Sequence, residues 1–267
     1  MNPWTDRVVI VTGASQGIGK AFCLEIARQR PKLVLAARDA RALDEVAQAC
    51  RATGAETLVV PTDVSLEESD RQLVEATVAK FGRIDALLLN AGLDMWARLD
   101  EVADSSIFER LMRVNYLGCV YPTLYALPHL KRSQGRLGVV ASVAGLTGVP
   151  TRTGYAATKH ALFGFFESLR IELHGSGVSV TMLAPDFVVS EIHRRAIGPD
   201  GKPLGESPMN EAKIMTAEEC ARQMARAVAG RKRLWIGSLR GRAGRFVRPL
   251  IPAVIDGIAR RAVARGH

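Results

Sequence analysis

Two side chains four residues apart could exchange a proton with a bound molecule. Tyr155 and Lys159 occur in the stretch YAATK, and residues at i and i+4 lie on one face of a helix, about 5–6 Å apart at Cβ. A free phenol is a weak base at neutral pH, but a nearby cation favours its ionised form. Tyr155 could therefore pass a proton to or from a hydroxyl or carbonyl oxygen. The alternative is an exposed helical pair.

Ser142 and Asn115 supply polar groups that would support such a reaction. Ser142 follows the apolar run 137–141. At the carboxyl end of a parallel strand, its hydroxyl would face the crevice in which doubly wound sheets bind ligands, and it could hydrogen-bond a substrate oxygen there. Asn115 lies among apolar residues of a predicted helix, 108–130. Its amide either satisfies local backbone or relays protons to Lys159 through water.

A glycine-rich segment near the N-terminus could hold a dinucleotide. The sequence TGASQGIG, residues 12–19, follows the β-branched run 8–11 and opens a predicted helix, 17–28. Glycines in this context let a pyrophosphate approach backbone N–H groups at the helix N-terminus. The spacing is G-x-x-x-G-x-G rather than G-x-G-x-x-G, and the alternative is a tight turn without a ligand.

Arg38 indicates which dinucleotide would bind. It follows the second predicted strand, 33–37, where a free ribose 2′-hydroxyl would need a carboxylate acceptor. A guanidinium instead suits bidentate phosphate binding, so Arg38 predicts a 2′-phosphate and hence NADP(H). Asp39 follows immediately and Gln16 adds no second cation, which leaves a surface arginine at a strand end as the alternative.

These residues need a scaffold that brings distant segments to one edge, and the hydrophobic pattern predicts it. Short apolar runs alternate with stretches of helical periodicity, which implies right-handed crossovers and a parallel sheet covered on both faces. We therefore predict an α/β fold, a single doubly wound Rossmann domain with three layers. The predicted strands are 7–11, 33–37, 57–61, 86–89, 137–141, 179–184 and 234–236, and the predicted helices are 17–28, 40–52, 66–81, 108–130, 153–174 and 215–229.

The distribution of charge separates a body from a tail. The 267 residues, 48% hydrophobic and 24% charged, are typical of a soluble globular protein and carry a net charge of +9. Residues 230–267 hold ten basic residues and one acidic residue, so the remainder is neutral. We predict one domain over 1–237 and a basic amphipathic extension over 238–267. A neutral body needs no nucleic-acid partner.

The segments expected to face a substrate are largely apolar. They are the loops 93–96 and 143–150 and a lid over about 190–215, which contains the Pro- and Gly-rich stretch 197–208. Their apolar members predict a hydrophobic carbonyl compound or alcohol, and no fixed charge is expected to recognise a substrate head group. The alternative is that these side chains, Leu93, Met95, Trp96, Leu146, Val149 and Phe187, pack the lid onto the body.

The tail 244–266 combines apolar residues at near-helical spacing with flanking arginines. Pro249 and Pro252 predict that a continuous helix starts only at about Pro252. This pattern is typical of an interfacial membrane helix or a partner-docking helix. The alternative is a helix that covers the substrate pocket or a neighbouring subunit.

The remaining features predict a cytoplasmic location, with membrane association left open by the tail. The four cysteines are scattered without the spacing of a zinc site or a redox pair, so we expect core thiols in a reducing compartment and no metal. The first residues contain no signal peptide, and no run of about 18 apolar residues suggests a spanning helix.

Taken in order, the motifs are recognisable. TGASQGIG, Asp63-Val64, NAG at 90–92, Asn115, Ser142 and YAATK occur in this sequence. On these motifs the chain resembles the short-chain dehydrogenase/reductase family from about residue 6 to residue 237. The stretch from Val114 through GFFESLRIEL at 164–173 resembles the branch that contains 11β-hydroxysteroid dehydrogenases and related membrane-associated reductases.

The resemblance implies a role for each motif. Tyr155 would be the general acid/base, Lys159 would support it and hold the nicotinamide ribose, Ser142 would orient the reacting oxygen, and Asn115 would complete a proton relay. The cofactor would be bound by Gly13, Ser15, Gln16, Ile18, Gly19, Arg38, Asp63, Val64, Asn90, Gly92, Tyr155, Lys159, Pro185 and Val188.

The implied function is an NADP(H)-dependent oxidoreductase that interconverts a hydrophobic ketone or aldehyde and its alcohol by hydride transfer. The family's usual assembly implies a homodimer or homotetramer. The alternative function is a non-catalytic dinucleotide sensor or scaffold that acts through its basic tail.

One position departs from the family pattern. Members usually carry Pro-Gly where this chain has Pro185-Asp186. A carboxylate near cofactor phosphates would be repulsive, so either Asp186 points away or this loop binds the nicotinamide half differently.

Overall fold

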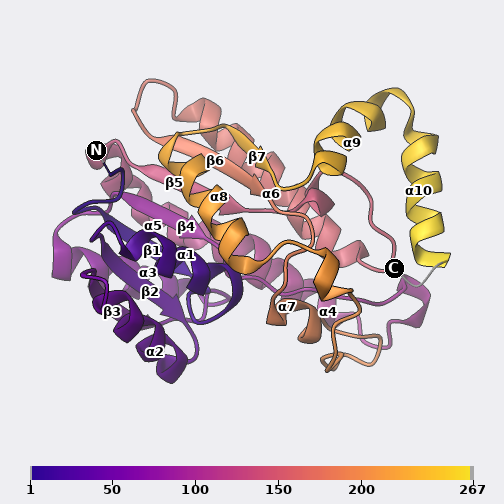
Figure 1. The fold of residues 1–267 in the computed structure, drawn as a ribbon, viewed down its shortest axis with the longest axis horizontal. Helices are drawn as coiled ribbons and strands as arrows, with labels where there is room; N and C mark the ends of the chain where they lie inside the picture. Colours follow the sequence, from indigo (N-terminus) through magenta and orange to yellow (C-terminus); the bar gives the residue numbers. More distant parts are fainter. Residues whose placement is uncertain (1, 265–267) are drawn as a thin grey trace.

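The computed structural model describes residues 2–264 and contains a seven-stranded parallel sheet at its centre (Figure 1). The strand order is β3-β2-β1-β4-β5-β6-β7. The strands are β1 (Val8–Thr12), β2 (Lys32–Ala37), β3 (Glu56–Pro61), β4 (Ala86–Leu89), β5 (Arg136–Val140), β6 (Ser179–Ala184) and β7 (Leu234–Ile236). The order reverses between β1 and β4, which opens a crevice at their carboxyl ends. The predicted α/β doubly wound fold is confirmed.

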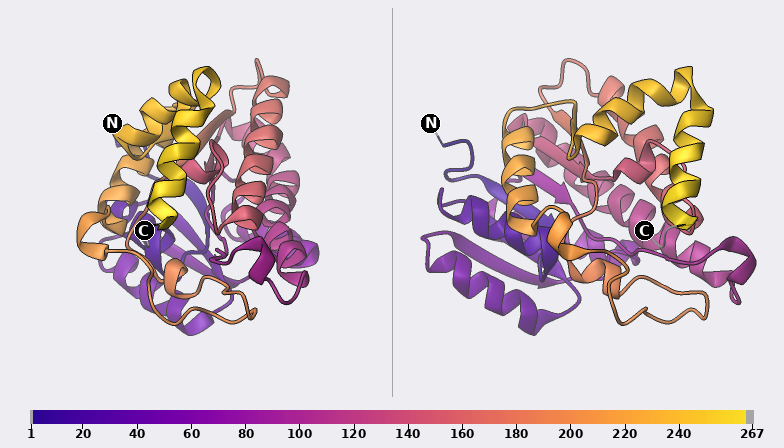
Figure 2. Two further views of the ribbon diagram at one scale, coloured as in Figure 1. Left: turned by 90° about the vertical axis from the view of Figure 1, so that its right-hand side faces the viewer. Right: turned by 45° about the vertical axis from the view of Figure 1, so that its right-hand side comes forward.

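Helices cover both faces of the sheet (Figures 1 and 2). They are α1 (Gly17–Ala27), α2 (Ala40–Arg51), α3 (Glu67–Phe81), α4 (Ser106–Met112), α5 (Gly118–Ser133), α6 (Thr153–Glu172), α7 (Glu191–Arg194), α8 (Ala217–Ala229), α9 (Leu239–Leu250) and α10 (Pro252–Ala264). Alternate residues of β1 point to opposite faces. Val9 and Val11 pack in the core beneath α1, α2 and α8, whereas Val8 and Ile10 pack beneath α3, α5 and α6.

The helix predicted over 108–130 is interrupted. A π-helical turn, Arg113–Leu117, separates α4 from α5. Pro122 lies inside α5, and since proline has no N–H it removes one helical hydrogen bond near this turn. Periodicity alone does not reveal such a turn, but π turns often occur at functional sites, and this one contains Asn115.

The tail forms two helices. A helix starts at Pro252, as predicted, and the chain breaks before it at Ile251, but the prediction missed the preceding helix α9. Ser238 caps α9 by accepting a hydrogen bond from the Gly241 N–H at 3.1 Å. Pro249 lies in the last turn of α9, one residue before that helix ends, and Pro252 is the first residue of α10, where a missing N–H costs nothing. The two helices fold back over the carboxyl edge of the sheet (Figure 2). Residues 265–267 of the predicted extension lie outside the described residues.

The predicted lid is an irregular segment tied to the loop after β4. It contains α7 and a short 3₁₀ turn at Glu211–Lys213. Isolated bridges pair Met95 with Ile197 and Val188 with Met215. Backbone hydrogen bonds therefore tie the lid to the loop after β4 at Ile197 and to the segment after β6 at Met215.

Two further sequence expectations concern the cysteines and the membrane. Cys23, Cys50, Cys119 and Cys220 are all buried free thiols, as their scattered spacing indicated. Among the helices of residues 2–264, none combines the length and apolar character that crossing a bilayer requires.

Candidate active site

A cleft of about 2040 Å³ lies at the carboxyl edge of the sheet and collects most of the predicted site residues. Those that line it are Gly13, Ser15, Gln16, Ile18, Arg38, Asp63, Val64, Asn90, Gly92, Ser142, Tyr155, Lys159, Pro185 and Val188. Gly19 and Asn115 are not among the lining residues. Residues that follow six strands, β1 to β6, therefore meet in one space, as the fold predicts.

At Gly13 and Gly19, the turn between β1 and α1 is packed too tightly for a side chain. A Cβ on Gly19 would lie 2.2 Å from the Gly13 carbonyl oxygen, and one on Gly13 would lie 2.8 Å from Asn90 Nδ2. Gly13 also has a positive φ of 65°, which favours glycine. Asn90 Nδ2 donates to the carbonyls of Thr12 and Gly13 at 3.0 and 3.2 Å and holds the turn closed. Gly19 thus does not line the cleft, but its lack of a side chain lets α1 pack closely against Gly13 and Asn90.

The amino end of α1 is open toward the cleft. Gln16 occupies the N-cap position with an extended backbone, and its side chain forms no cap hydrogen bond. The first N–H groups of a helix lack partners within the helix and carry the positive end of its dipole. A turn with glycines at its tightest positions, beside uncapped N–H groups, fits the pyrophosphate of a nicotinamide dinucleotide.

Arg38 is exposed at the end of β2 and lines the cleft. The carboxylate of Asp39 is committed elsewhere, because it accepts a hydrogen bond from the Ala42 N–H at 3.0 Å and caps α2. Among the ion pairs of the described residues, none includes Arg38. The guanidinium is therefore free to face a ligand phosphate.

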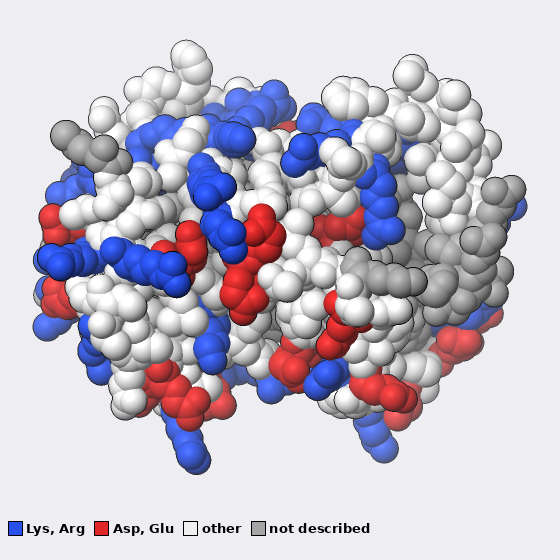
Figure 3. Space-filling view, in the orientation of Figure 1, with Lys and Arg blue, Asp and Glu red and all other residues white. Residues whose placement is uncertain are grey.

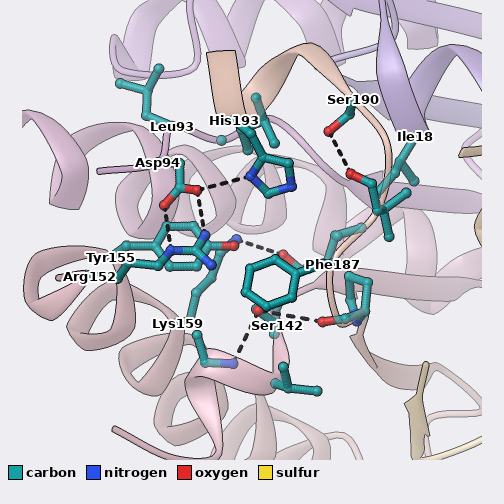
Figure 4. Close-up of a pocket in the computed structure, with 18 of the residues that line it drawn as sticks. Ile18, Leu93, Asp94, Ser142, Arg152, Tyr155, Lys159, Phe187, Ser190 and His193 are labelled. Carbon is teal, nitrogen blue, oxygen red and sulfur yellow. Dashed lines mark hydrogen bonds and ion pairs between the residues drawn. The ribbon is translucent and has the colours of Figure 1, made fainter. Parts of the chain in front are cut away.

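Tyr155, Lys159 and Ser142 converge at the far end of the cleft (Figure 4). Tyr155 and Lys159 lie one turn apart on α6, both buried, with Lys159 Nζ 5.5 Å from the centre of the phenol ring. Lys159 Nζ donates to the Val140 carbonyl at 2.9 Å. Ser142 follows β5, and its Oγ accepts from the Ala144 N–H at 3.1 Å. A hydroxyl, a phenol and an ammonium thus face the same space.

Asn115 lies behind this wall, fully buried. Its Nδ2 donates to the Leu93 carbonyl at 2.9 Å and to Thr158 Oγ1 at 3.0 Å, and its Oδ1 accepts from the Leu93 N–H at 2.7 Å. The side chain therefore fastens the loop after β4 to α6. The backbone that Asn115 satisfies is therefore not local, because Leu93 lies 22 residues away in the sequence.

A buried ion pair beside Tyr155 was missed from the sequence. Arg152 Nε donates to Asp94 Oδ1 at 3.0 Å and Nη2 donates to Oδ2, with both side chains almost inaccessible. Burial lowers the pKa of Arg152, but the charge of Asp94 raises it, and the balance lies above the ordinary value. His193 on α7 places Nδ1 3.6 Å from Asp94 Oδ2.

Arg152 and Asp94 both line the cleft, so the expectation that the substrate side carries no fixed charge is wrong. Arg152 lies three residues before Tyr155, a spacing that places two residues on one side of a helix. That spacing was the available signal for Arg152. Nothing local indicated Asp94, which lies 58 residues away in the sequence.

Asp186 points toward the tail. Its carboxylate accepts hydrogen bonds from Ser238 Oγ at 2.6 Å and from Arg240 Nε and Nη2 at 2.7 and 2.9 Å. Burial raises the pKa of Asp186, but the hydrogen bonds from Arg240 and Ser238 bring it below the ordinary value. The structure therefore agrees with the first of the two alternatives for this departure, in which the Asp186 side chain is directed elsewhere.

The sequence of this chain matches the family model described as short chain dehydrogenase over residues 7–198. That match spans the glycine turn, Ser142, Tyr155 and Lys159. The chain belongs to the short-chain dehydrogenase family.

Curated relatives of this short-chain dehydrogenase include several plant proteins. An 11-beta-hydroxysteroid dehydrogenase of Pinus massoniana is 38% identical over 81% of this chain and 62% of its own length. 11-beta-hydroxysteroid dehydrogenase A of Sesamum indicum is 37% identical over 83% of this chain and 65% of its own length. This chain thus spans less than two thirds of the length of these two relatives. The resemblance to that branch is confirmed.

Two solved structures share the fold. A short chain dehydrogenase/reductase from Burkholderia phymatum in complex with NAD has a TM-score of 0.83 and 27% identity, over 95% of this chain and 96% of the other. An alcohol dehydrogenase from Thermococcus sibiricus complexed with 5-hydroxy-NADP has a TM-score of 0.74 and 27% identity, over 86% and 95% of the two chains. One of these two structures thus holds NAD and the other holds 5-hydroxy-NADP.

In this short-chain dehydrogenase the tail forms part of the wall of the cleft. Ile255 and Ile258 of α10 line it, and Arg248 Nη1 of α9 donates to the Leu146 carbonyl. Of the apolar loop residues expected to face a substrate, Leu93, Trp96, Leu146, Val149 and Phe187 line the cleft, whereas Met95 packs in a buried cluster behind it. The tail position matches the alternative in which its helices cover the pocket.

Proposed function

We propose that this chain is an NADP(H)-dependent oxidoreductase that interconverts a hydrophobic ketone or aldehyde and its alcohol. The observation that carries the proposal is that Ser142, Tyr155 and Lys159 line the same cleft. That cleft also contains the glycine turn and the uncapped amino end of α1. The relatives named 11-beta-hydroxysteroid dehydrogenase support a hydrophobic substrate. The apolar loops and the isoleucines of α10 support it independently, because apolar walls favour apolar ligands.

In the proposed reaction, the position of each side chain in the cleft determines what it does. A bound nicotinamide supplies or accepts the hydride. Ser142 donates a hydrogen bond to the reacting oxygen, and Tyr155 gives it a proton during reduction or takes one during oxidation. Lys159, buried one turn away, keeps a positive charge beside the phenol. Asn115 holds the loop after β4 against α6 at Thr158, the residue before Lys159, and in the proposed relay it connects to Lys159 through water.

Replacing the phenol hydroxyl tests the function. Tyr155→Phe keeps the ring but removes the proton donor, so we expect turnover to fall by at least about 100-fold while cofactor binding persists. The measurement is the kcat for hydrophobic aldehydes, ketones and secondary alcohols with NADPH or NADP, together with a thermal shift for binding.

Tyr121→Phe is the matched control, since Tyr121 lies on α5 and is not among the residues that line the cleft. Retained turnover in Tyr155→Phe would contradict the proposed proton donor. A wild-type protein that binds the dinucleotide but turns over none of these compounds would favour the non-catalytic sensor or scaffold.

The preference for NADP(H) rests on Arg38. Its guanidinium is exposed in the cleft while Asp39 is engaged in capping α2. Arg38→Ala should weaken NADPH binding by about tenfold, the value of one charge-assisted contact of about 1.4 kcal/mol, and leave NADH binding unchanged. Calorimetric titration with both cofactors measures this. Equal losses for NADH and NADPH, or a wild type that favours NADH, would contradict it.

We also propose that the chain self-associates as a homodimer or homotetramer through α5 and α6. Leu124 on α5 is 58% exposed and Ile171 on α6 is 65% exposed. Large exposed apolar side chains on adjoining helices favour association. Light scattering of the wild type and of a Leu124→Glu, Ile171→Glu double variant measures the mass. A monomeric wild type would contradict this assembly.

A further inference from the structure

We propose that Arg152 is a positioning residue for Tyr155, and that the Arg152–Asp94 pair sets how readily the phenol ionises. This inference rests on the proposed function, because it concerns the group that moves the proton. It adds a second cation to the one that the Tyr155–Lys159 spacing supplies.

Arg152 is the cation nearest to the ring in the described structure. Its guanidinium carbon lies 4.3 Å from the centre of the Tyr155 ring, whereas Lys159 Nζ lies at 5.5 Å. Trp96 and Phe187 also lie within 5.4 and 5.6 Å of the guanidinium. A guanidinium held among aromatic rings restricts the orientation of each of them. Arg152 therefore holds the phenol ring as well as placing charge beside it.

Asp94 fixes the guanidinium. It forms two hydrogen bonds with Arg152 from a fully buried position, and Asp94 Oδ1 also accepts from the Met95 N–H at 2.8 Å. Figure 4 shows Asp94 on one side of Arg152 and the Tyr155 ring alongside it. With both of its bonds to the guanidinium in place, Asp94 restrains Arg152 and partly offsets its charge.

The charges at this end of the cleft act on the phenol with opposite signs. A nearby cation favours the phenolate and a nearby anion disfavours it, most strongly where water is excluded. Arg152 and Lys159 therefore favour ionisation of Tyr155, and Asp94 opposes it. Outside the ends of β2 and β3, the other ionisable groups that line the cleft are Glu109, Arg110 and Arg113 around the π turn, Asp186 after β6, Glu191, His193 and Arg195 at α7, and Arg240 and Arg245 on α9.

Replacing Arg152 and replacing Asp94 should move the pH profile of activity in opposite directions. Arg152→Gln removes the cation, so we expect the rise of kcat/KM for alcohol oxidation to shift by about one unit to higher pH, with about tenfold lower activity at a pH below the rise. Asp94→Asn leaves the cation unopposed, and the rise should shift to lower pH. Arg152→Lys keeps the charge without the planar contact and should lie between wild type and Arg152→Gln.

A second readout needs no turnover. The ultraviolet difference spectrum of tyrosinate, wild type minus Tyr155→Phe, follows ionisation of this one phenol directly. It should shift in the same directions for Arg152→Gln and Asp94→Asn. Arg98→Gln is the matched control, because Arg98 is an exposed arginine that pairs with Asp100 at the surface, and it should leave both readouts unchanged.

The outcomes separate this inference from the proposed function. Unchanged profiles and spectra in a folded Arg152→Gln variant, or shifts of Arg152→Gln and Asp94→Asn in the same direction, overturn the inference. If Arg152→Gln does not fold, Arg152→Lys and Asp94→Asn carry the same comparison. A wild type without Tyr155-dependent turnover overturns the proposed function, while the tyrosinate spectra still decide the role of Arg152.

Discussion

Asp70 is a carboxyl group that folding buries without a partner. It lies on α3 with no exposed surface, and neither of its oxygens has a hydrogen-bond partner among the described residues. Burial and the neighbouring charge of Asp63 raise its pKa to about 8. At neutral pH this carboxyl is therefore protonated in the folded protein and ionised in the unfolded chain.

This difference predicts a pH-dependent cost in stability. Because the folded pKa lies above the unfolded value of about 3.9, Asp70 destabilises the fold increasingly as pH rises from about 4 to 8, by up to about 1.4 kcal/mol per pH unit. Asp70→Asn is neutral at every pH, so its free energy of unfolding should exceed that of the wild type by a margin that grows over this range. Urea denaturation at several pH values measures the margin.

The exposed Asp44→Asn on α2 is the control, and its difference from wild type should not change with pH. A margin for Asp70→Asn that stays constant between pH 4 and 8 would show that Asp70 is ionised in the folded protein.

At the scale of elements, the link between Asp186 and Arg240 decides where α9 lies. Asp186 follows β6 and receives hydrogen bonds from both Ser238, the N-cap of α9, and Arg240 in its first turn. A family position that usually carries glycine is thus used to dock the tail. The same contact engages both oxygens of the carboxylate with the tail.

Loosening this contact should affect substrate binding more than chemistry. Arg240→Gln removes one partner of a half-exposed ion pair, so we expect KM for a hydrophobic substrate to rise by about 2- to 5-fold with kcat nearly unchanged. Steady-state kinetics measures both values, and limited proteolysis follows the release of α9. Arg226→Gln, an exposed arginine on α8, is the control. A fall in kcat at constant KM would contradict a docking role.

At the scale of the whole molecule, the net positive charge and the most exposed of the large apolar side chains lie on the tail. Leu239, Phe246 and Leu250 are 80%, 70% and 80% exposed, beside the arginines of α9. Figure 3 shows blue side chains next to the white surface where Figure 1 places α9 and α10. One side of the tail covers the cleft and the other faces outward, and we propose that the outward side contacts an anionic membrane surface.

Vesicle sedimentation tests this contact. The protein should bind vesicles that contain phosphatidylserine and dissociate as the salt concentration rises, since screening weakens the attraction to arginines. Phe246→Ser with Leu250→Ser should reduce binding strongly, whereas the exposed Leu99→Ser, distant in sequence from the tail, should not. Binding of equal strength to vesicles of neutral lipid, or no binding to either kind, would contradict the proposal.

Much of this molecule follows from local pattern. The alternation of apolar runs with helical periodicity determines a parallel sheet covered on both faces, and the carboxyl ends of parallel strands meet at one edge. The glycine turn, Ser142 and Tyr155 occupy such positions in the sequence, so their meeting in one cleft could be predicted. The proposed chemistry also follows from the sequence, because it depends on residue type and on spacing within single elements.

Tertiary structure alone decided the rest, because it depends on contacts between segments far apart in the chain. Asp94 meets Arg152 across 58 residues and Asp186 meets Arg240 across 54, and no periodicity encodes such pairs. The commitment of Asn115 to backbone and the path of the tail over the cleft depend likewise on how side chains pack between distant segments. The sequence thus determined the scaffold and its reacting groups, whereas packing decided which charges surround Tyr155 and what covers its substrate.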